Sequence, residues 1–159
     1  MWKLAIDLGS SMTKIYRADT SSGIVLAEPS CVAVVGEDKE VKAVGKEAKN
    51  LIGKTAEYTS IIYPVYEGEI VDMRLAVLML KEFFARIGVK SATLKRAQVL
   101  INLPCGATSQ TVNDYVNLAE ECGLKKVFFA EQPYLGAVGS GVAFSNFDPV
   151  FCMDIGGGV

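Results

Sequence analysis

The sequence contains no histidine, and none of its four cysteines forms a C-x-x-C pair. Without histidine, neither a Ser-His-Asp or Cys-His catalytic group nor a Cys/His zinc site can form. Cys31, Cys105, Cys122 and Cys152 lie far apart in the chain, so we interpret them as reduced cysteines of the core. The chemistry of this protein must therefore depend on other side chains or on backbone groups.

A strong excess of charge and long apolar runs are also missing. The 159 residues carry a net charge of −2, which argues against a nucleic-acid partner. The apolar runs are too short to span a bilayer, and the start of the chain does not have the charged and apolar regions of a signal peptide. With 50% hydrophobic residues the chain can bury a core, and we expect a cytoplasmic protein.

The stretch LAIDLGSSMTKI near the N-terminus predicts a phosphate-binding turn. A short apolar strand leads into Asp7 and then into Gly9, Ser10 and Ser11, whose backbone N–H groups are unhindered enough to converge on an anion. A second strand follows, so the turn is the tip of a hairpin, and the ammonium group of Lys14 could reach the same anion. An ordinary hairpin uses similar residues, so one such turn is a weak signal.

The same pattern recurs at the far end of the chain as FCMDIGGG, in which Asp154 precedes Gly156, Gly157 and Gly158. Two matching units indicate an internal duplication, and their two hairpins could face each other and hold a polyphosphate between their amides. Asp7 and Asp154 would then hold a magnesium ion through its water molecules, because this ion dehydrates reluctantly.

Between these units, short strands give way to strands that alternate with helices. We expect a three-stranded antiparallel meander first, then a small α+β insertion over residues 31–66 with a helix over 44–52. The later expected elements are helices that begin after Asp72, after Thr108 or Ser109 and at Pro133, and strands over Gln98–Leu103 and Val127–Glu131. This order predicts an α/β fold with a mixed sheet, parallel strands and right-handed crossover helices.

Parallel sheets bind ligands at the carboxyl ends of their strands. That rule selects Glu131 and Gln132, the polar pair at a strand exit, as candidate catalytic residues. The spacing is equally compatible with an alternative, in which Gln132 only caps the helix that Pro133 opens.

Two glycine patterns resemble nucleotide motifs and do not fit them. GKT at 53–55 resembles the end of a Walker A loop, but Ala48 stands where that motif needs glycine and the segment follows a helix. Gly136, Gly139 and Gly141 have the order G-x-x-G-x-G instead of G-x-G-x-x-G, so close helix packing explains them better.

Five motifs in order resemble those of the bacterial actins of the rod-shape-determining MreB family, within the actin, heat-shock chaperone and sugar kinase superfamily. They are DLGSS at 7–11, EGEIVD at 67–72, LPCGAT at 103–108, EQPYLGAVGSG at 131–141 and DIGGG at 154–158. The resemblance implies an actin-like (ribonuclease H-like) ATPase domain. Its subdomain IA would comprise about 1–30 and 67–145, subdomain IB 31–66, and the first strand and phosphate loop of a second domain 146–159.

The resemblance also implies that ATP and Mg²⁺ are the cofactors. The implied phosphate-binding residues are Gly9, Ser10, Ser11, Lys14, Gly156, Gly157 and Gly158, and the implied metal-binding residues are Asp7 and Asp154. Two positions depart from the family pattern. Lys14 is closer to eukaryotic actin than to most MreB proteins, and Gln132 replaces the glutamate of most relatives, so it can position water but is a poor general base.

As a whole, the resemblance implies the N-terminal half of an ATP-binding cytoskeletal protein that polymerises and helps determine cell shape. The implied partners of the full-length protein are other copies of itself, the cell-wall synthesis machinery and the inner face of the membrane. Because the family's second domain continues beyond this length and supplies the adenosine pocket, we expect a fragment or a truncated relative without ATPase activity of its own. Two alternatives remain open: half of a sugar or acetate kinase, and an interaction module that has lost nucleotide chemistry.

Overall fold

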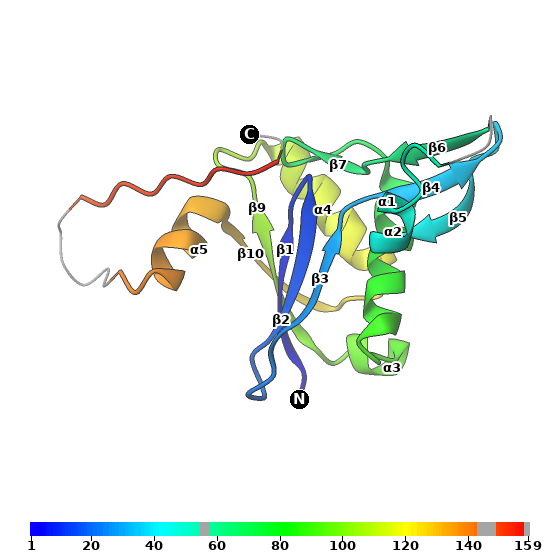
Figure 1. The fold of residues 1–159 in the computed structure, drawn as a ribbon. Helices are drawn as coiled ribbons and strands as arrows, with labels where there is room; N and C mark the ends of the chain where they lie inside the picture. Colours follow the sequence, from blue (N-terminus) through cyan, green and yellow to red (C-terminus); the bar gives the residue numbers. More distant parts are fainter. Residues whose placement is uncertain (55–57, 143–148, 158–159) are drawn as a thin grey trace.

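The computed structural model describes residues 1–54, 58–142 and 149–157 of the chain. Its centre is a five-stranded sheet with the order β10-β9-β1-β2-β3 (Figure 1). These strands are β1 (Lys3–Leu8), β2 (Met12–Arg17), β3 (Gly23–Pro29), β9 (Gln98–Leu103) and β10 (Lys126–Glu131). The predicted meander and both later strands are confirmed, and the sheet is mixed.

The pairing of the strands determines where the ends of the sheet lie. β1 to β3 pair antiparallel in sequence order, and β9 lies parallel to both β1 and β10. The carboxyl ends of β1, β9 and β10 therefore lie at one edge of the sheet. In the β1–β2 hairpin Asp7 lies opposite Lys14, and the turn between the strands contains Gly9, Ser10 and Ser11.

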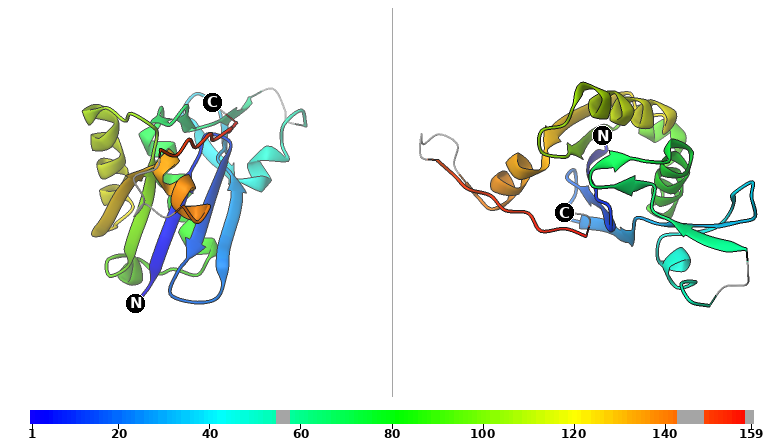
Figure 2. Two further views of the ribbon diagram at one scale, coloured as in Figure 1. Left: turned by 90° about the vertical axis from the view of Figure 1, so that its left-hand side faces the viewer. Right: turned by 90° about the horizontal axis from the view of Figure 1, so that it is seen from above.

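Two long helices cover one face of this sheet, and a shorter one lies on the other side (Figure 2). α2 (Met73–Arg86) and α4 (Ser109–Glu121) form the covered face, and α5 (Gln132–Gly139) follows β10 directly. Asp72 and Thr108 cap α2 and α4 as predicted: their side chains accept hydrogen bonds from backbone N–H groups at 3.0 and 3.1 Å. A short helix, α3 (Ser91–Leu94), precedes β9.

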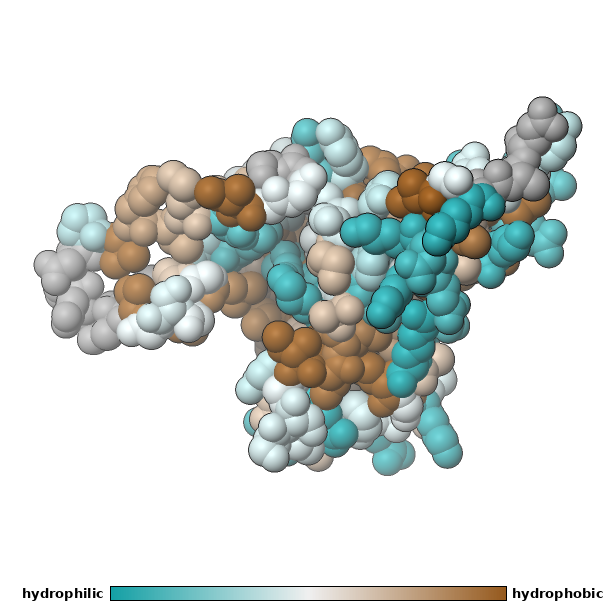
Figure 3. Space-filling view, in the orientation of Figure 1, coloured by the Kyte–Doolittle hydropathy of each residue, from teal (hydrophilic) through white to brown (hydrophobic). Residues whose placement is uncertain are grey.

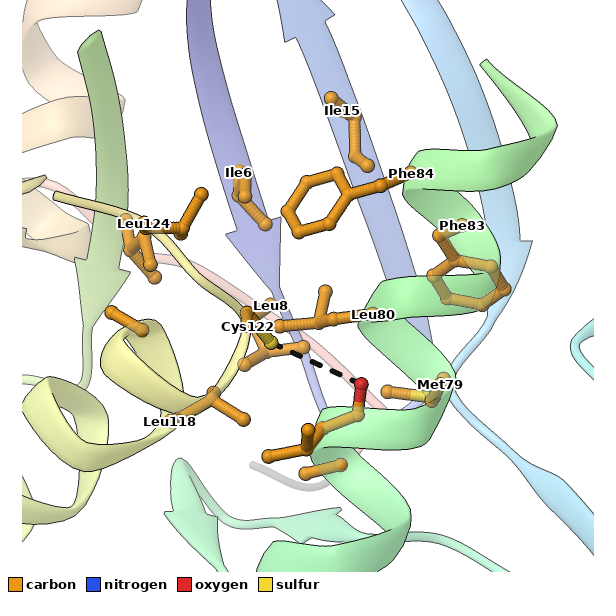
Figure 4. Packing of buried hydrophobic residues seen from close by; sticks show 14 of the residues in the cluster. Ile6, Leu8, Ile15, Met79, Leu80, Phe83, Phe84, Leu118, Cys122 and Leu124 are labelled. Atoms are coloured by element: carbon orange, nitrogen blue, oxygen red, sulfur yellow. Dashed lines mark hydrogen bonds between the residues drawn. The ribbon is translucent and has the colours of Figure 1, made fainter. Parts of the chain in front are cut away.

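The core lies between α2, α4 and the sheet. Phe84 of α2 points toward Ile6 and Ile15 of the sheet, and Leu80, one turn earlier, lies beside Cys122 at the end of α4 (Figure 4). All five are buried. This apolar layer fixes the central strands, and with them the edge of the sheet where β1, β9 and β10 end.

The predicted insertion is a separate small sheet with the order β5-β4-β6. Its elements are β4 (Val32–Val35), β5 (Glu40–Val44), α1 (Lys46–Lys49) and β6 (Thr59–Ile62). The helix expected over 44–52 was too long, because Val44 pairs with Val32 in the sheet and Gly45, with φ 67° and ψ −132°, ends the strand before α1 begins. Strands β5 and β6 were not predicted.

The C-terminal segment differs from the prediction. Residues 149–157 contain neither helix nor strand, although a strand followed by a hairpin was expected there. None of the described strands pairs with this segment, and an isolated extended chain does not form a strand without a partner. Figure 1 shows the segment in red as it returns past α5 to the upper ends of β1 and β2. In the described ranges, no helix has both the length and the apolarity needed to cross a membrane.

Candidate functional site

A cleft of about 710 Å³ opens where β1, β9 and β10 end. Its walls come from the β1–β2 turn, the start of α5, the loop after β9 and the C-terminal segment. The predicted site residues that line it are Asp7, Gly9, Ser10, Ser11, Lys14, Gln132, Asp154, Gly156 and Gly157. The structure thus brings together residues from opposite ends of the sequence. Gly158 lies outside the described residues.

The first wall is the turn between β1 and β2. The N–H of Gly9 donates to the carbonyl oxygen of Met12 at 3.2 Å, and a Cβ atom at Gly9 would lie 2.9 Å from that oxygen. Only glycine therefore fits this turn without a shift of the backbone. Among the described residues, the N–H groups of Ser10 and Ser11 have no hydrogen-bond partner, so they are available to an anion in the cleft.

The second wall is the end of the C-terminal segment, which lies directly against the first. A Cβ atom at Gly157 would overlap the Cβ atom of Ser11 and press against its Oγ. The two small-residue turns therefore face each other, as the repeated pattern predicted. In the part of the chain that the structure describes, Gly156 and Gly157 also have N–H groups without a hydrogen-bond partner.

A chain of polar contacts crosses the floor of the cleft. Lys14 Nζ lies 3.0 Å from Asp7 Oδ2. Asn102 Nδ2 donates to Asp7 Oδ1 at 3.1 Å and to Gln132 Oε1 at 3.4 Å. The other end of the Gln132 amide, Nε2, donates to Asp154 Oδ2. Both aspartates are thus connected through two side-chain amides.

Asn102 was not selected from the sequence. It is 5% exposed, and its Oδ1 accepts a hydrogen bond from the backbone N–H of Leu8 at 2.8 Å. A signal was present: Asn102 is a polar residue near the end of the apolar strand QVLINL, and a buried polar side chain needs partners. Without knowledge of the neighbouring strands, that signal did not reveal which groups it bonds.

The structure separates the predicted pair Glu131 and Gln132. Gln132 lines the cleft, whereas Glu131 is exposed and is not part of its wall. Neighbouring residues at the end of a strand point to different sides, so one of the two faces away. The alternative role of Gln132 as a helix cap is not observed either: Glu131 holds the N-cap position of α5, and no side chain caps that helix.

A small hairpin closes a further side of the cleft. Its strands are β7 (Val65–Tyr66) and β8 (Glu69–Ile70), and Glu67 and Gly68 at its tip line the cleft. Tyr115 Oη donates to the carbonyl oxygen of Gly68 at 3.0 Å. Burial raises the pKa of Tyr115, and the nearby charges of Glu69 and Asp7 add to this effect. The phenol therefore remains neutral and keeps its hydrogen bond at physiological pH.

The carboxylates of the cleft suit a hydrated magnesium ion better than a metal held by the protein alone. No group of three or more histidine, cysteine or acidic residues arranged for metal binding occurs in the described ranges. Asp7 and Asp154 each keep lone pairs that could accept hydrogen bonds from metal-bound water. Magnesium is commonly held by one or two carboxylates, with water and substrate phosphates as its other ligands.

Comparison with known proteins relates these features to a family. The family model described as MreB/Mbl protein matches residues 1–159. The cell shape-determining protein MreB of Escherichia coli is 36% identical over 159 residues, which cover 98% of this chain and 45% of that protein. The cell shape-determining protein Mbl of Bacillus subtilis is 34% identical over 155 residues, which cover 98% of this chain and 46% of that protein.

Solved structures agree with the sequence comparison. MreB5 of Spiroplasma citri bound to AMPPNP superposes with a TM-score of 0.78 and 31% identity, over 88% of this chain and 41% of that one. The same protein bound to ADP gives a TM-score of 0.76. The chain spans less than half the length of these relatives, and its fold is the actin-like fold of their N-terminal part. The chain belongs to the MreB/Mbl family.

Proposed function

We propose that this chain is the phosphate-binding half of an ATP-dependent, actin-like cytoskeletal protein that polymerises and helps determine cell shape. The observation that carries the proposal is the contact between the turn at 9–11 and the turn at 156–157, which lie at opposite ends of the sequence and line one cleft. Phosphate groups of a nucleotide would lie between the backbone N–H groups of these turns. Relatives bound to ADP and AMPPNP support a nucleotide as the ligand.

The charged side chains of the cleft would have two different roles in phosphate binding. Lys14 would contact the phosphates as a point charge, and Asp7 and Asp154 would hold a magnesium ion through its water molecules. When bound, this ion would neutralise charge that develops on the phosphates. We place the chain as subdomain IA at 1–30 and 67–145, subdomain IB at 31–66 and the start of a second domain at 146–159.

Gln132 would position the attacking water. A side-chain amide can orient water through its oxygen and its N–H groups, but it cannot take up a proton in the pH range of the cell. We therefore expect Gln132→Ala in the complete protein to slow hydrolysis far more than it weakens ATP binding. Membership of the MreB/Mbl family further suggests that the partners are other copies of the protein in a filament, the cell-wall synthesis machinery and the inner face of the membrane.

Electron microscopy of the complete protein with and without ATP tests this function. Filaments that form only with ATP would support it. A soluble phosphorylated product without filaments would support the kinase alternative instead, and neither filaments nor ATP binding would indicate an interaction module.

The facing turns offer a matched pair of variants for the same experiment. Gly157→Ala places a methyl group into Ser11, whereas Gly139→Ala adds one on α5, where nothing lies within 4 Å. We expect Gly157→Ala to weaken ATP binding at least tenfold, because the two turns must separate, and to prevent filaments at limiting ATP. Gly139→Ala should behave like the wild type. Equal behaviour of both variants would show that the turns do not cooperate in binding.

A further inference from the structure

Asn102 occupies the point where the two halves of the proposed site meet. It lies on β9, the strand between β1 and β10, with Ala130 of β10 as its register partner. From there its side chain reaches Asp7 and Leu8 at the end of β1, and Gln132 at the start of α5. No other described side chain bonds to both Asp7 and Gln132.

The oxygen and the nitrogen of the Asn102 amide group both have hydrogen-bond partners. Its oxygen accepts from the N–H of Leu8 at 2.8 Å, and its nitrogen donates to Asp7 at 3.1 Å and to Gln132 at 3.4 Å. The residue is 5% exposed. Because each bond fixes the same rigid amide plane, the Leu8 contact determines the direction in which the two N–H groups point.

This direction sets the orientation of Gln132. The Nδ2 group of Asn102 can only donate, so it pairs with the oxygen of the Gln132 amide and turns the Gln132 nitrogen toward Asp154. One lone pair of that oxygen and one N–H of that nitrogen are then left for a water molecule. Contacts of this kind are often long in the free protein and shorten once the ligand is bound.

We propose that Asn102 is a positioning residue for hydrolysis: it holds the Gln132 amide in the single orientation that can align the attacking water. This inference rests on the proposed function, since it assumes that a nucleotide is hydrolysed in the cleft. It goes beyond that function by naming a residue that touches neither the phosphates nor the water and still controls the rate.

One substitution separates this role from a merely structural one. Asn102→Asp keeps an oxygen that can accept from Leu8, and it replaces the N–H groups that face Asp7 and Gln132. In the complete protein at saturating ATP and Mg²⁺, we expect single-turnover hydrolysis to slow roughly 10- to 100-fold, the scale of a misplaced reacting group. Asn117→Asp, the same change at an exposed position of α4, should leave the rate unchanged.

The decisive readout is the coupling to Gln132. If Asn102 acts through Gln132, adding Asn102→Asp to Gln132→Ala should change the rate less than about twofold, because the group to be oriented is already gone. Independent effects that multiply in the double variant would overturn the inference, as would a wild-type rate in Asn102→Asp. Asn102→Thr, which suits a strand and adds no charge beside Asp7, gives the same test if the aspartate variant does not fold.

Calorimetry of the wild-type protein with ATP distinguishes the two possible failures. If the wild type does not bind ATP, the proposed function is wrong and the role of Asn102 falls with it. If the wild type binds and hydrolyses ATP while the effects of the two substitutions multiply, the proposed function stands and only the role of Asn102 is wrong.

Discussion

At the scale of single residues, Lys14 and Asp7 form an exposed ion pair, to which we assign a role in ligand binding and little role in stability. Their side chains are 49% and 40% exposed and approach to 3.0 Å. Exposed pairs of this kind contribute about 0 to 1 kcal/mol to folding. The pair lines the cleft beside the turn at 9–11, where the ammonium group can exchange part of its contact with the carboxylate for contact with a phosphate.

Replacing Lys14 by alanine tests this role. In the complete protein, Lys14→Ala should weaken ATP binding by about 1.5 to 3 kcal/mol, the value of a charge-assisted hydrogen bond, and leave the melting temperature nearly unchanged. Lys42→Ala removes the same charge from an exposed position of β5 and should not alter affinity. Calorimetry that finds equal ATP affinity for both variants would mean that Lys14 is a solvated strand residue.

Cysteine ionisation predicts a dependence of stability on pH. Burial raises the pKa of the Cys122 thiol from 9.0 to about 12. Because the unfolded chain loses this proton at lower pH than the folded one, the contribution of the thiol to stability is complete below pH 9 and is lost as the pH rises toward 12. The loss amounts to about 1.4 kcal/mol per pH unit.

Urea denaturation at pH 8 and at pH 10.5 measures this effect. The free energy of unfolding should fall less steeply with pH in Cys122→Ala than in the wild type. Cys105→Ala, at an exposed cysteine, should keep the wild-type slope. Identical slopes for all three proteins would contradict the burial of an intact thiol at this position.

At the scale of elements, the sequence predicts best where side-chain periodicity and capping agree. Gln98–Leu103 was predicted to the residue, and α2 begins after the cap that Asp72 provides. Prediction failed where pairing with distant strands decides the structure. Val44 is a strand residue because it lies opposite Val32, and residues 149–157 form no strand because no described strand pairs with them.

The candidate site shows the same difference between features set by local sequence and features set by long-range strand pairing. The small residues of both turns were visible as a repeated local pattern, so the two walls of the cleft could be predicted. The role of Asn102 depends on the order of β1, β9 and β10 in the sheet. That order is set by long-range pairing, which leaves no local signal in the sequence.

Arg86 connects α2 to the small sheet. Its guanidinium lies 3.5 Å from Glu28, 3.5 Å from Glu47 and 3.2 Å from Glu82, and donates to the carbonyl oxygen of Val44 at 3.1 Å. The side chain of Arg86 is 25% exposed, so these contacts are only partly screened by water. One planar group with several donors therefore links α2 to the small sheet, in addition to the apolar packing of Val32 and Val44 in the core.

Hydrogen exchange tests this connection. Arg86→Lys retains the charge but loses the planar fork, so opening of residues 40–49 should cost about 1 to 2 kcal/mol less and their amides should exchange about 5 to 30 times faster. Amides of the five-stranded sheet should be unaffected. Arg96→Lys, at an exposed position after α3, is the matched control. Unchanged exchange over 40–49 would assign the orientation to apolar packing instead.

At the scale of the whole molecule, the C-terminal segment leaves apolar side chains uncovered. Phe151, Met153 and Ile155 are 85%, 68% and 81% exposed. Brown side chains gather at this end of the molecule in the space-filling view (Figure 3). Exposed apolar side chains in a row commonly mark a surface that pairs with other chain segments.

The 159-residue chain by itself should therefore associate through this segment. Light scattering coupled to gel filtration should find dimers or larger species for residues 1–159 and monomers for residues 1–142. We also expect residues 1–159 to have no measurable ATPase activity, because contacts to phosphate and magnesium alone leave the adenine unburied. Monomers of both chains, or turnover comparable to that of the complete protein, would contradict this expectation.

The central claim is that two turns from opposite ends of this chain hold the phosphates of one nucleotide. The most direct test is a structure of the complete protein with Mg²⁺ and a non-hydrolysable ATP analogue. We predict phosphate oxygens within hydrogen-bond distance of the N–H groups at 10–11 and 156–157, with the metal-bound water molecules on Asp7 and Asp154. A nucleotide bound elsewhere, with the cleft between these turns empty, would contradict the claim.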